Sequence, residues 1–205
     1  MLYLTKQIGA TQLAIWKIEE SKGELLSMLE NRDWIENILS IKSDKILLEK
    51  LAVRVLLKEL FGEEKQVCYY STGRPYLSDE SSFITISHTR GYAVVAVNKL
   101  HPIGIDIEYI SEKIRRVQSR VVSEKEYIDK DKELEHLLLH WSAKEAIFKV
   151  LDAEGIDYID HIYVHPFNPK SEGDFQVSEY KTSNQKIFDL YYLIDMDYVL
   201  ALTLN

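Results

Sequence analysis

The sequence predicts an α+β protein made of two similar halves, residues 1–102 and 103–205. A strand, a turn and a second strand follow one another over residues 83–97, and the same pattern returns over residues 191–202. Each half also contains a long helical pattern that is separate in sequence from its strand pair. Such a repetition is expected when two related halves are fused, and His101-Pro102 predicts the boundary between them.

The first half begins with strands and continues with helices. Residues 2–18 alternate loosely between apolar and polar side chains, which predicts one or two strands. A short helix is expected over residues 33–39 and a longer one over residues 44–61, with Ser43 as its N-cap and Gly62 just past its end. Apolar residues at steps of three and four place the longer helix in the core. They are Leu47, Leu48, Leu51, Ala52, Val55 and Leu56.

The remainder of the first half predicts a turn and a hairpin. Gly73-Arg74-Pro75 indicates the turn, because glycine relaxes the backbone and proline fixes φ. Residues 83–88 and 92–97 are rich in β-branched and aromatic side chains and predict two strands around residues 89–91.

The second half predicts a strand at residues 104–108, a helix from about Ser111, and another helix over about residues 131–151. Residues 166–186 contain two prolines, a glycine and several polar side chains, so an exposed loop or hairpin is expected there. The strand pair at residues 191–202 completes the half.

Composition narrows the class of protein. A chain of 205 residues with 46% hydrophobic and 28% charged residues is typical of a soluble globular protein. The net charge of −8 argues against general nucleic-acid binding, and no apolar run is long enough to cross a membrane. The start of the chain lacks the basic segment and long apolar run of a targeting signal. With Cys68 as its one cysteine, the chain cannot form an internal disulfide, which suits a reducing, cytoplasmic location.

Three carboxylates are the main candidates for chemistry. Asp106 and Glu108 are two residues apart in a predicted strand, so both side chains point to the same face. Glu145 lies in the predicted helix 131–151. Hard oxygen ligands of this kind suit Mg²⁺, which fills its other positions with water and substrate phosphate oxygens. The pattern therefore predicts phosphoryl-type chemistry on a phosphate-bearing substrate.

Simpler interpretations of these residues stay open. Asp106 and Glu108 could form a solvated strand end, and Glu145 and Lys149, one helical turn apart, could form a surface ion pair. The apolar neighbours on the helix favour a site, because buried charges need partners or a metal. These neighbours are Leu138, Trp141, Ala146, Ile147 and Phe148. Lys144 lies on an adjacent face and could meet either solvent or phosphate.

Ser87 and His88 lie where a predicted strand enters its turn, a place where side chains reach ligands. A lone histidine is more often structural or simply exposed. The chain has no Gly-x-Ser-x-Gly motif of a serine hydrolase and no glycine-rich phosphate loop. A nucleotide-like ligand would therefore have to be held by side chains and a metal.

Five short motifs, taken in order, resemble those of the 4′-phosphopantetheinyl transferases. Their order and spacing are similar to those of the larger, surfactin-synthetase-activating type. The motifs are Gly73-Arg74-Pro75, Ile86-Ser87-His88-Thr89, Gly104-Ile105-Asp106-Ile107-Glu108, Ser123-Glu124-Lys125-Glu126-Tyr127, and Trp141-Ser142-Ala143-Lys144-Glu145-Ala146-Ile147-Phe148-Lys149.

The resemblance implies a fold and an activity. The fold is a monomer of two α+β halves related by pseudo-twofold symmetry, with coenzyme A bound in the cleft between them. The activity is transfer of the phosphopantetheine arm of coenzyme A to a serine hydroxyl of an apo acyl or peptidyl carrier protein. Adenosine 3′,5′-bisphosphate is released.

The resemblance also implies roles for single residues. Asp106, Glu108 and Glu145 would hold Mg²⁺ against the diphosphate, and Lys149 would reach the same phosphates. The 3′-phosphate and adenosine side of coenzyme A would be held by Lys45, Arg74 and His88, with Ser87 and Lys144 as further binding residues. Arg74 stands where many relatives have lysine, and Lys45 stands where arginine is frequent. The positive charge is kept at both positions, but Lys45 cannot make the bidentate contact that a guanidinium makes.

The transfer needs a base for the serine proton. Glu145 is the first choice, directly or through a water on the metal, and Asp106 is the second. A carboxylate held tightly by Mg²⁺ is a poorer proton acceptor, and the sequence leaves open which one is less engaged. Lys149 completes the set of predicted catalytic residues.

A basic segment is the candidate docking surface for the carrier protein. Lys113, Arg116 and Arg120 are three and four residues apart. An apolar stripe lies beside them, formed by Ile114, Val117 and Val121. A solvated helix face is the alternative. We predict that this helix receives an acidic helix of the carrier protein.

Two other functions are compatible with the same residues. One is a non-catalytic relative that binds coenzyme A or a carrier protein, and the other is a Mg²⁺-dependent phosphohydrolase. The carrier, the choice between Mg²⁺ and Mn²⁺, and tolerance for acylated coenzyme A are left open by the sequence.

Overall fold

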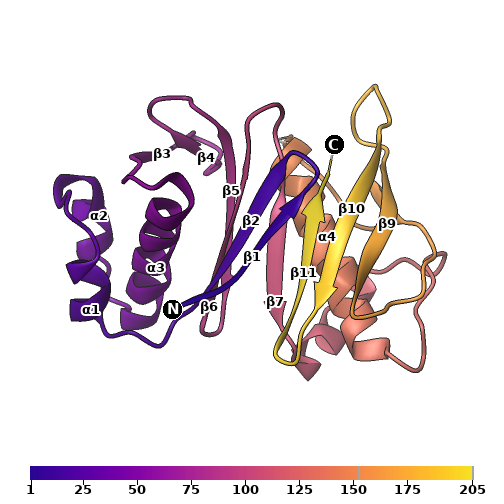
Figure 1. Ribbon diagram of the computed structural model, residues 1–205. Helices are drawn as coiled ribbons and strands as arrows, with labels where there is room; N and C mark the ends of the chain where they lie inside the picture. The colour runs from indigo at the N-terminus through magenta and orange to yellow at the C-terminus, as the bar shows by residue number, and fades with distance from the viewer. Residues whose placement is uncertain (152, 205) are drawn as a thin grey trace. The chain divides into compact units, whose positions relative to one another are not determined.

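The computed structural model describes residues 1–151 and 153–204, which form two compact units, Met1–Pro102 and Ile103–Asn205. Each unit combines an antiparallel sheet with one long helix (Figure 1). The predicted α+β class is therefore confirmed. The pseudo-twofold relation between the halves stays a prediction.

The sheet of the first unit has four strands in the order β1-β2-β6-β5, and every neighbouring pair is antiparallel. Its strands are β1 (Leu2–Ile8), β2 (Thr11–Lys17), β5 (Phe83–Thr89) and β6 (Tyr92–Asn98). The predicted hairpin is β5–β6, in which Thr89 pairs with Tyr92 across a turn that contains Gly91 at a φ of 76°. Glycine suits this turn because it adopts positive φ without steric cost.

Helix α3 (Asp44–Phe61) begins and ends as predicted. The Ser43 side chain accepts a hydrogen bond from the amide of Ile46, and Gly62 ends the helix in the left-handed conformation at a φ of 72°. Leu51 and Leu56 of this helix are fully buried in a core shared with β6 and with α1 (Lys22–Ser27).

Five short elements of the first unit differ from the prediction. Helix α1 was not predicted, although Ser21 and Glu24 form a capping box at its start. The single short helix expected over residues 33–39 is a 3₁₀ helix, Asp33–Ile35, followed by α2 (Glu36–Leu39). Around the predicted turn, β3 (Val67–Tyr69) and β4 (Pro75–Leu77) form a small separate sheet.

The sheet of the second unit has five strands in the order β7-β11-β10-β9-β8, all antiparallel. They are β7 (Ile105–Tyr109), β8 (Ile162–Val164), β9 (Glu172–Glu179), β10 (Ile187–Ile194) and β11 (Tyr198–Thr203). Helix α4 (Glu133–Leu151) packs on β7 and β11 (Figure 1). Its buried residues Leu137, Leu139 and Ile147 join the core of this unit.

One prediction for the second unit is wrong. No α-helix starts near Ser111 in the described part of the chain; two 3₁₀ helices, Glu112–Arg116 and Gln118–Arg120, occupy this segment. Its several β-branched residues lower helix propensity, and Val117 breaks the helical run at a φ of −114° and a ψ of 1°. Of the loop or hairpin expected at residues 166–186, the structure shows the hairpin: β9 pairs with β10, and Phe175 and Val177 of β9 alternate with polar residues and enter the core.

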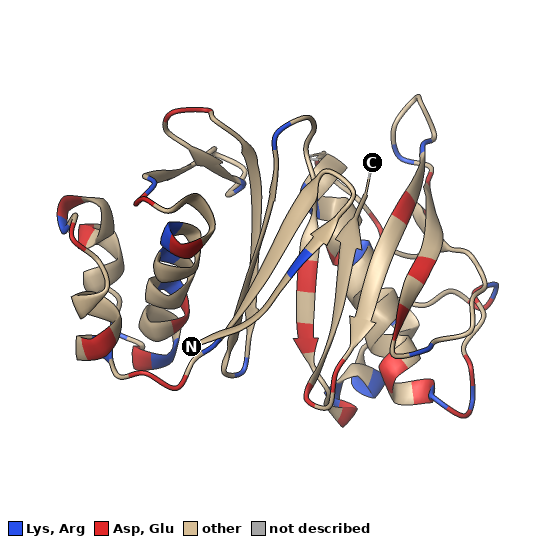
Figure 2. Cartoon of the chain, in the orientation of Figure 1, with Lys and Arg blue, Asp and Glu red and all other residues tan. Residues whose placement is uncertain are grey.

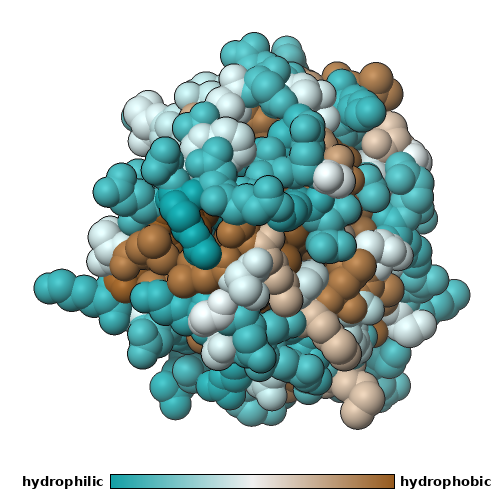
Figure 3. Space-filling model, turned by 60° about the vertical axis from the view of Figure 1, so that its left-hand side comes forward, coloured by the Kyte–Doolittle hydropathy of each residue, from teal (hydrophilic) through white to brown (hydrophobic). Residues whose placement is uncertain are grey.

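Charged and apolar side chains are both widespread on the surface. Figure 2 shows acidic residues on β7, β9 and β10. Figure 3 shows apolar side chains interrupted by hydrophilic ones on the face that it presents.

Within residues 1–151 and 153–204, no helix is both long enough and apolar enough to span a membrane.

Candidate active site

Strand β7 carries two of the candidate carboxylates on one face. Asp106 and Glu108 pair with Ala201 and Val199 of β11, and two residues of spacing in a strand put them on the same side. The intervening Ile107 is 1% exposed and belongs to the core of the unit. The alternation predicted from the sequence is therefore confirmed, and Asp106 itself is only 5% exposed.

Gly104 lets the start of β7 approach α4 closely. A Cβ atom built on Gly104 would lie 1.9 Å from the carbonyl oxygen of Ala146 and 2.9 Å from Cγ2 of Val150. Ala146 is the neighbour of Glu145, so this backbone contact sets how near the carboxylates of β7 come to those of the helix.

We expect Gly104→Ala to lower the free energy of unfolding by about 1–3 kcal/mol, because the strand or helix must move to admit the methyl group. Urea denaturation measures this loss. Gly23→Ala is the matched control, since the nearest atom to its new Cβ is 4.0 Å away and alanine favours helices. Equal stability of the two variants would contradict the close packing at Gly104.

Helix α4 presents Trp141, Glu145 and Lys149 at steps of four residues, so the three side chains lie along one face. The Lys149 ammonium donates to Oδ1 of Asp106 at 3.0 Å and to the carbonyl oxygen of Ile105 at 2.7 Å. The Trp141 indole donates to Oε1 of Glu108 at 2.9 Å. Three hydrogen bonds thereby join the helix to β7, and they bring Lys149 and Trp141 against the two carboxylates of the strand.

Glu145 is held by a residue that the sequence analysis missed. The Tyr158 hydroxyl donates to Oε1 of Glu145 at 2.8 Å. Tyr158 lies outside all five motifs, and nothing in the sequence distinguishes it from the other tyrosines of the chain, which has 13. Burial is the main reason why the pKa of Tyr158 is raised, and the neighbouring carboxylates raise it further, so this phenol stays protonated and donates.

The three carboxylates affect one another electrostatically. Burial raises the pKa of Glu108 to about 7, and repulsion from Asp106 and Glu145 adds to this effect, while the Trp141 hydrogen bond opposes it. The pKa of Glu145 is also raised, first by burial and then by Asp106, with the Tyr158 hydrogen bond opposing. A cation placed among these groups would stabilise their charged forms.

The chemistry of this donor set fits Mg²⁺, since all three groups are hard oxygen donors with mutual repulsion that a divalent ion would relieve. Among residues 1–151 and 153–204, no group of three or more His, Cys, Asp or Glu side chains is already arranged to hold a metal ion. Asp106, Glu108 and Glu145 would therefore have to turn toward a shared ion, and the metal site stays a prediction.

Lys144 corrects the sequence analysis. Its side chain is fully buried and points into the interior, where the ammonium contacts Oε2 of Glu126 at 2.8 Å and the carbonyl oxygens of Val121 at 2.6 Å and Tyr158 at 2.8 Å. Burial lowers the pKa of Lys144, and Glu126 opposes that shift. An ammonium engaged in this way is not available to phosphate, which argues against the predicted coenzyme A contact.

Glu126 is the second residue whose role was missed. It is 8% exposed, and besides Lys144 it accepts hydrogen bonds at 2.8 Å from the amides of Ser123 and Val164. The motif around residues 123–127 contains it, but the motif alone did not indicate its partner. The Glu126–Lys144 pair therefore fastens this segment and β8 to α4.

The first unit brings together two of the predicted coenzyme A residues. Nδ1 of His88 on β5 lies 3.1 Å from Oε2 of Glu49, and Nζ of Lys45 lies 3.6 Å from its other oxygen. Glu49 is only 4% exposed and was also missed, although its position four residues after Lys45 on α3 is an ion-pair spacing. Ser87 precedes His88 on β5 and points to the opposite face, and Arg74 lies in the turn between β3 and β4.

The family model of the 4′-phosphopantetheinyl transferase superfamily matches residues 102–203, the segment that carries Asp106, Glu108, Glu145 and Lys149. The chain belongs to this superfamily. The family predicted from the motifs is therefore confirmed. The larger type is confirmed as well, by similarity to the transferases Sfp and psf-1.

Two relatives of this superfamily member come from bacilli. The 4′-phosphopantetheinyl transferase Sfp of Bacillus subtilis (strain 168) is 27% identical over 167 residues, which cover 77% of this chain and 72% of the relative. The 4′-phosphopantetheinyl transferase psf-1 of Bacillus pumilus is 29% identical over 127 residues, which cover 58% of this chain. The latter match spans about half of the relative, 54% of its length.

Proposed function

We propose that the chain transfers the 4′-phosphopantetheine group of coenzyme A to a serine hydroxyl of an apo acyl or peptidyl carrier protein in a Mg²⁺-dependent reaction. The observation that carries this proposal is the group of Asp106, Glu108, Glu145 and Lys149 within the segment that matches the superfamily. The names of both relatives agree with it.

In the proposed reaction the serine oxygen attacks the β-phosphorus of coenzyme A. The bond between that phosphorus and the bridging oxygen breaks, and adenosine 3′,5′-bisphosphate leaves with the electron pair. A bound Mg²⁺ would be held by Asp106, Glu108 and Glu145 and would neutralise charge on the diphosphate. Lys149 supplies a positive charge beside Asp106.

A carboxylate takes the serine proton in this scheme. Glu145 is the first candidate, directly or through a water on the metal. Asp106 is the second candidate, although Lys149 holds one of its oxygens at 3.0 Å. The contacts of coenzyme A with Lys45, Arg74, Ser87 and His88 stay predictions, as do the monomeric state and the cytoplasmic location.

Incubation with coenzyme A, Mg²⁺ and a panel of apo carrier proteins tests the proposal. Transfer adds about 340 Da to the carrier by nucleophilic attack of its serine. The modification is expected to require the serine and to stop when the metal is chelated. A carrier bound without a mass gain indicates a non-catalytic binding protein, and release of phosphate without a carrier indicates a phosphohydrolase; either result overturns the proposal.

The basic segment is the proposed docking surface for the carrier, although it consists of 3₁₀ helices. Lys113, Arg116 and Arg120 are all exposed, while Ile114 anchors the segment in the core at 6% exposure. Acidic partner surfaces are attracted to such a local positive patch even when the whole chain is negative.

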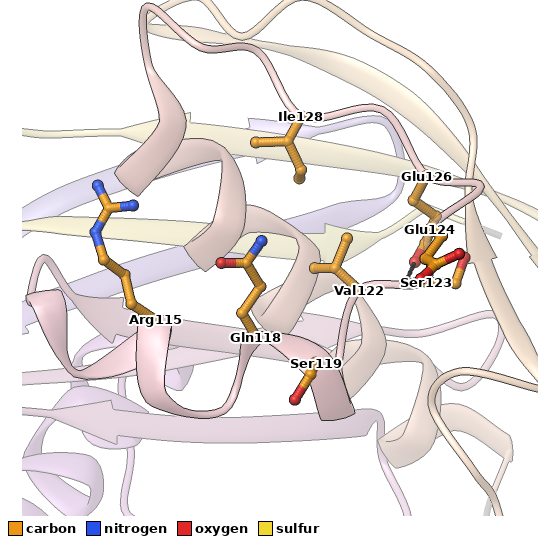
Figure 4. A pocket seen from close by; sticks show the side chains of 8 residues that line it. All are labelled: Arg115, Gln118, Ser119, Val122, Ser123, Glu124, Glu126 and Ile128. Atoms are coloured by element: carbon orange, nitrogen blue, oxygen red, sulfur yellow. Dashed lines mark hydrogen bonds between the residues drawn. The ribbon is translucent and has the colours of Figure 1, made fainter.

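A cavity of about 440 Å³ lies beside this segment. Figure 4 shows Arg115 and Gln118 on one side of it, and Val122 and Ile128 around its apolar part. The cavity lies within the second unit, next to the proposed docking residues. It could admit an apolar side chain of a docked carrier helix.

We expect Arg116→Glu with Arg120→Glu to raise the KM for the carrier at least about 10-fold and to leave the KM for coenzyme A unchanged, because rim charges act on partner encounter. Steady-state kinetics with each substrate varied in turn measures both constants. Lys170→Glu with Lys186→Glu has the same net charge change on exposed residues elsewhere in the unit. A defect confined to coenzyme A would contradict this docking surface.

A further inference from the structure

Each of the three candidate metal ligands has one oxygen held by a protein donor. Lys149 holds Asp106, Trp141 holds Glu108, and Tyr158 holds Glu145. The first two donors belong to α4 and to the motif that predicted the site. Tyr158 comes from the segment after the helix, outside every motif, so its contact is a feature of this chain that needs its own explanation.

Tyr158 is fixed in place from two sides. Its carbonyl oxygen accepts a hydrogen bond at 2.8 Å from Lys144, whose ammonium is itself held by the fully buried carboxylate of Glu126. Its ring packs edge-on against Trp141, with centroids 6.1 Å apart at 86°, and against Phe148, with centroids 6.4 Å apart at 76°. The backbone and the ring of Tyr158 are therefore both fixed, and its hydroxyl is held beside Glu145.

Glu145 needs such an anchor. Its long side chain has several rotatable bonds, and repulsion from Asp106 and Glu108 favours conformations that point away from them. A hydrogen bond from a rigid donor to Oε1 restricts these conformations. Partners of this kind orient metal ligands, and their removal typically weakens metal binding by about 10–100-fold.

We infer that Tyr158 is a positioning residue that restricts the conformations of Glu145, so that this carboxylate stays within a short turn of a divalent cation shared with Asp106 and Glu108. This inference rests on the proposed function. Lys144 supports Tyr158 by donating a hydrogen bond to its carbonyl oxygen. This contact gives the buried lysine of the motif a role that does not involve phosphate.

Tyr158→Phe tests the inference, because it removes the hydroxyl and keeps the ring that packs on Trp141 and Phe148. Binding of Mn²⁺ to the protein without carrier, followed by electron paramagnetic resonance, is expected to weaken by about 10–100-fold. The Mg²⁺ concentration for half-maximal transfer should rise by a similar factor, while the KM for the carrier and the melting temperature stay near their original values.

Tyr163→Phe is the matched control. Tyr163 is also half-buried and packs against an imidazole ring, but its hydroxyl contacts the carbonyl oxygen of Lys125 at 3.5 Å and no carboxylate. Its variant is expected to bind Mn²⁺ like the original protein.

The outcomes separate the two hypotheses. If the original protein transfers phosphopantetheine and Tyr158→Phe binds Mn²⁺ as tightly as Tyr163→Phe does, the positioning role is wrong and the proposed function stands. If the original protein binds Mn²⁺ and Tyr158→Phe weakens binding, but no carrier is ever modified, the proposed function is wrong and the positioning role stands. If the original protein does not bind Mn²⁺ at all, the positioning role is wrong.

Discussion

Asp106→Asn is expected to reduce kcat/KM for phosphopantetheine transfer by at least about 100-fold, a typical loss when a group that stabilises charge in the transition state is removed. The change keeps the size of the side chain and an oxygen that can accept from Lys149. It removes the negative charge that a divalent cation would bind. Initial rates from the mass of the carrier, with each substrate saturating in turn, measure the loss.

The matched control for this variant is Asp174→Asn. Asp174 lies on β9 of the same unit, is exposed and is distant in sequence from the three candidate ligands. Circular dichroism of both variants is expected to match the original protein. Turnover of Asp106→Asn close to that of Asp174→Asn, with the fold intact, would contradict the metal assignment and the mechanism based on it.

Lys144→Met is expected to lower the free energy of unfolding by about 3–5 kcal/mol, because it leaves the Glu126 carboxylate buried without its cation. The carbonyl oxygens of Val121 and Tyr158 also lose a donor. Urea denaturation followed by circular dichroism measures the change. Had Lys144 met phosphate as first predicted, the variant would mainly raise the KM for coenzyme A and leave stability almost unchanged.

Two further variants define the cause of this loss. Lys125→Met removes an exposed lysine from the same segment and is expected to change stability by less than about 0.5 kcal/mol. Adding Glu126→Gln to Lys144→Met should recover part of the loss, since the uncompensated charge is then gone. A double variant less stable than the sum of its single changes would contradict the ion-pair explanation.

Local signals predicted the elements that depend on neighbouring residues. Ser43 and Gly62 define the ends of α3 because a cap and a left-handed glycine act within one turn of the helix. Alternation placed Asp106 and Glu108 on one face of β7 for the same reason. The prediction of an α-helix after Ser111 is wrong because basic residues three and four apart also fit successive 3₁₀ turns. The β-branched residues of this segment favour such turns over a continuous α-helix.

Partners distant in sequence could not be predicted. Glu126 and Lys144 are 18 residues apart, and Tyr158 and Glu145 are 13 apart on different elements. No periodicity relates such positions, since their contacts depend on how the segments before and after α4 pack on the helix. The resemblance to known transferases supplied the identity of Asp106, Glu108, Glu145 and Lys149, but it did not show that Lys144 points into the interior.

The anchoring of Tyr158 by the Glu126–Lys144 pair has a consequence for protein engineering. Substituting both members with well-packed apolar side chains often makes a protein more heat-resistant. Here the same change would remove the donor that fixes the Tyr158 carbonyl. Thermotolerance and turnover would then move in opposite directions, so a stabilised version of this enzyme should be sought through surface substitutions in the first unit.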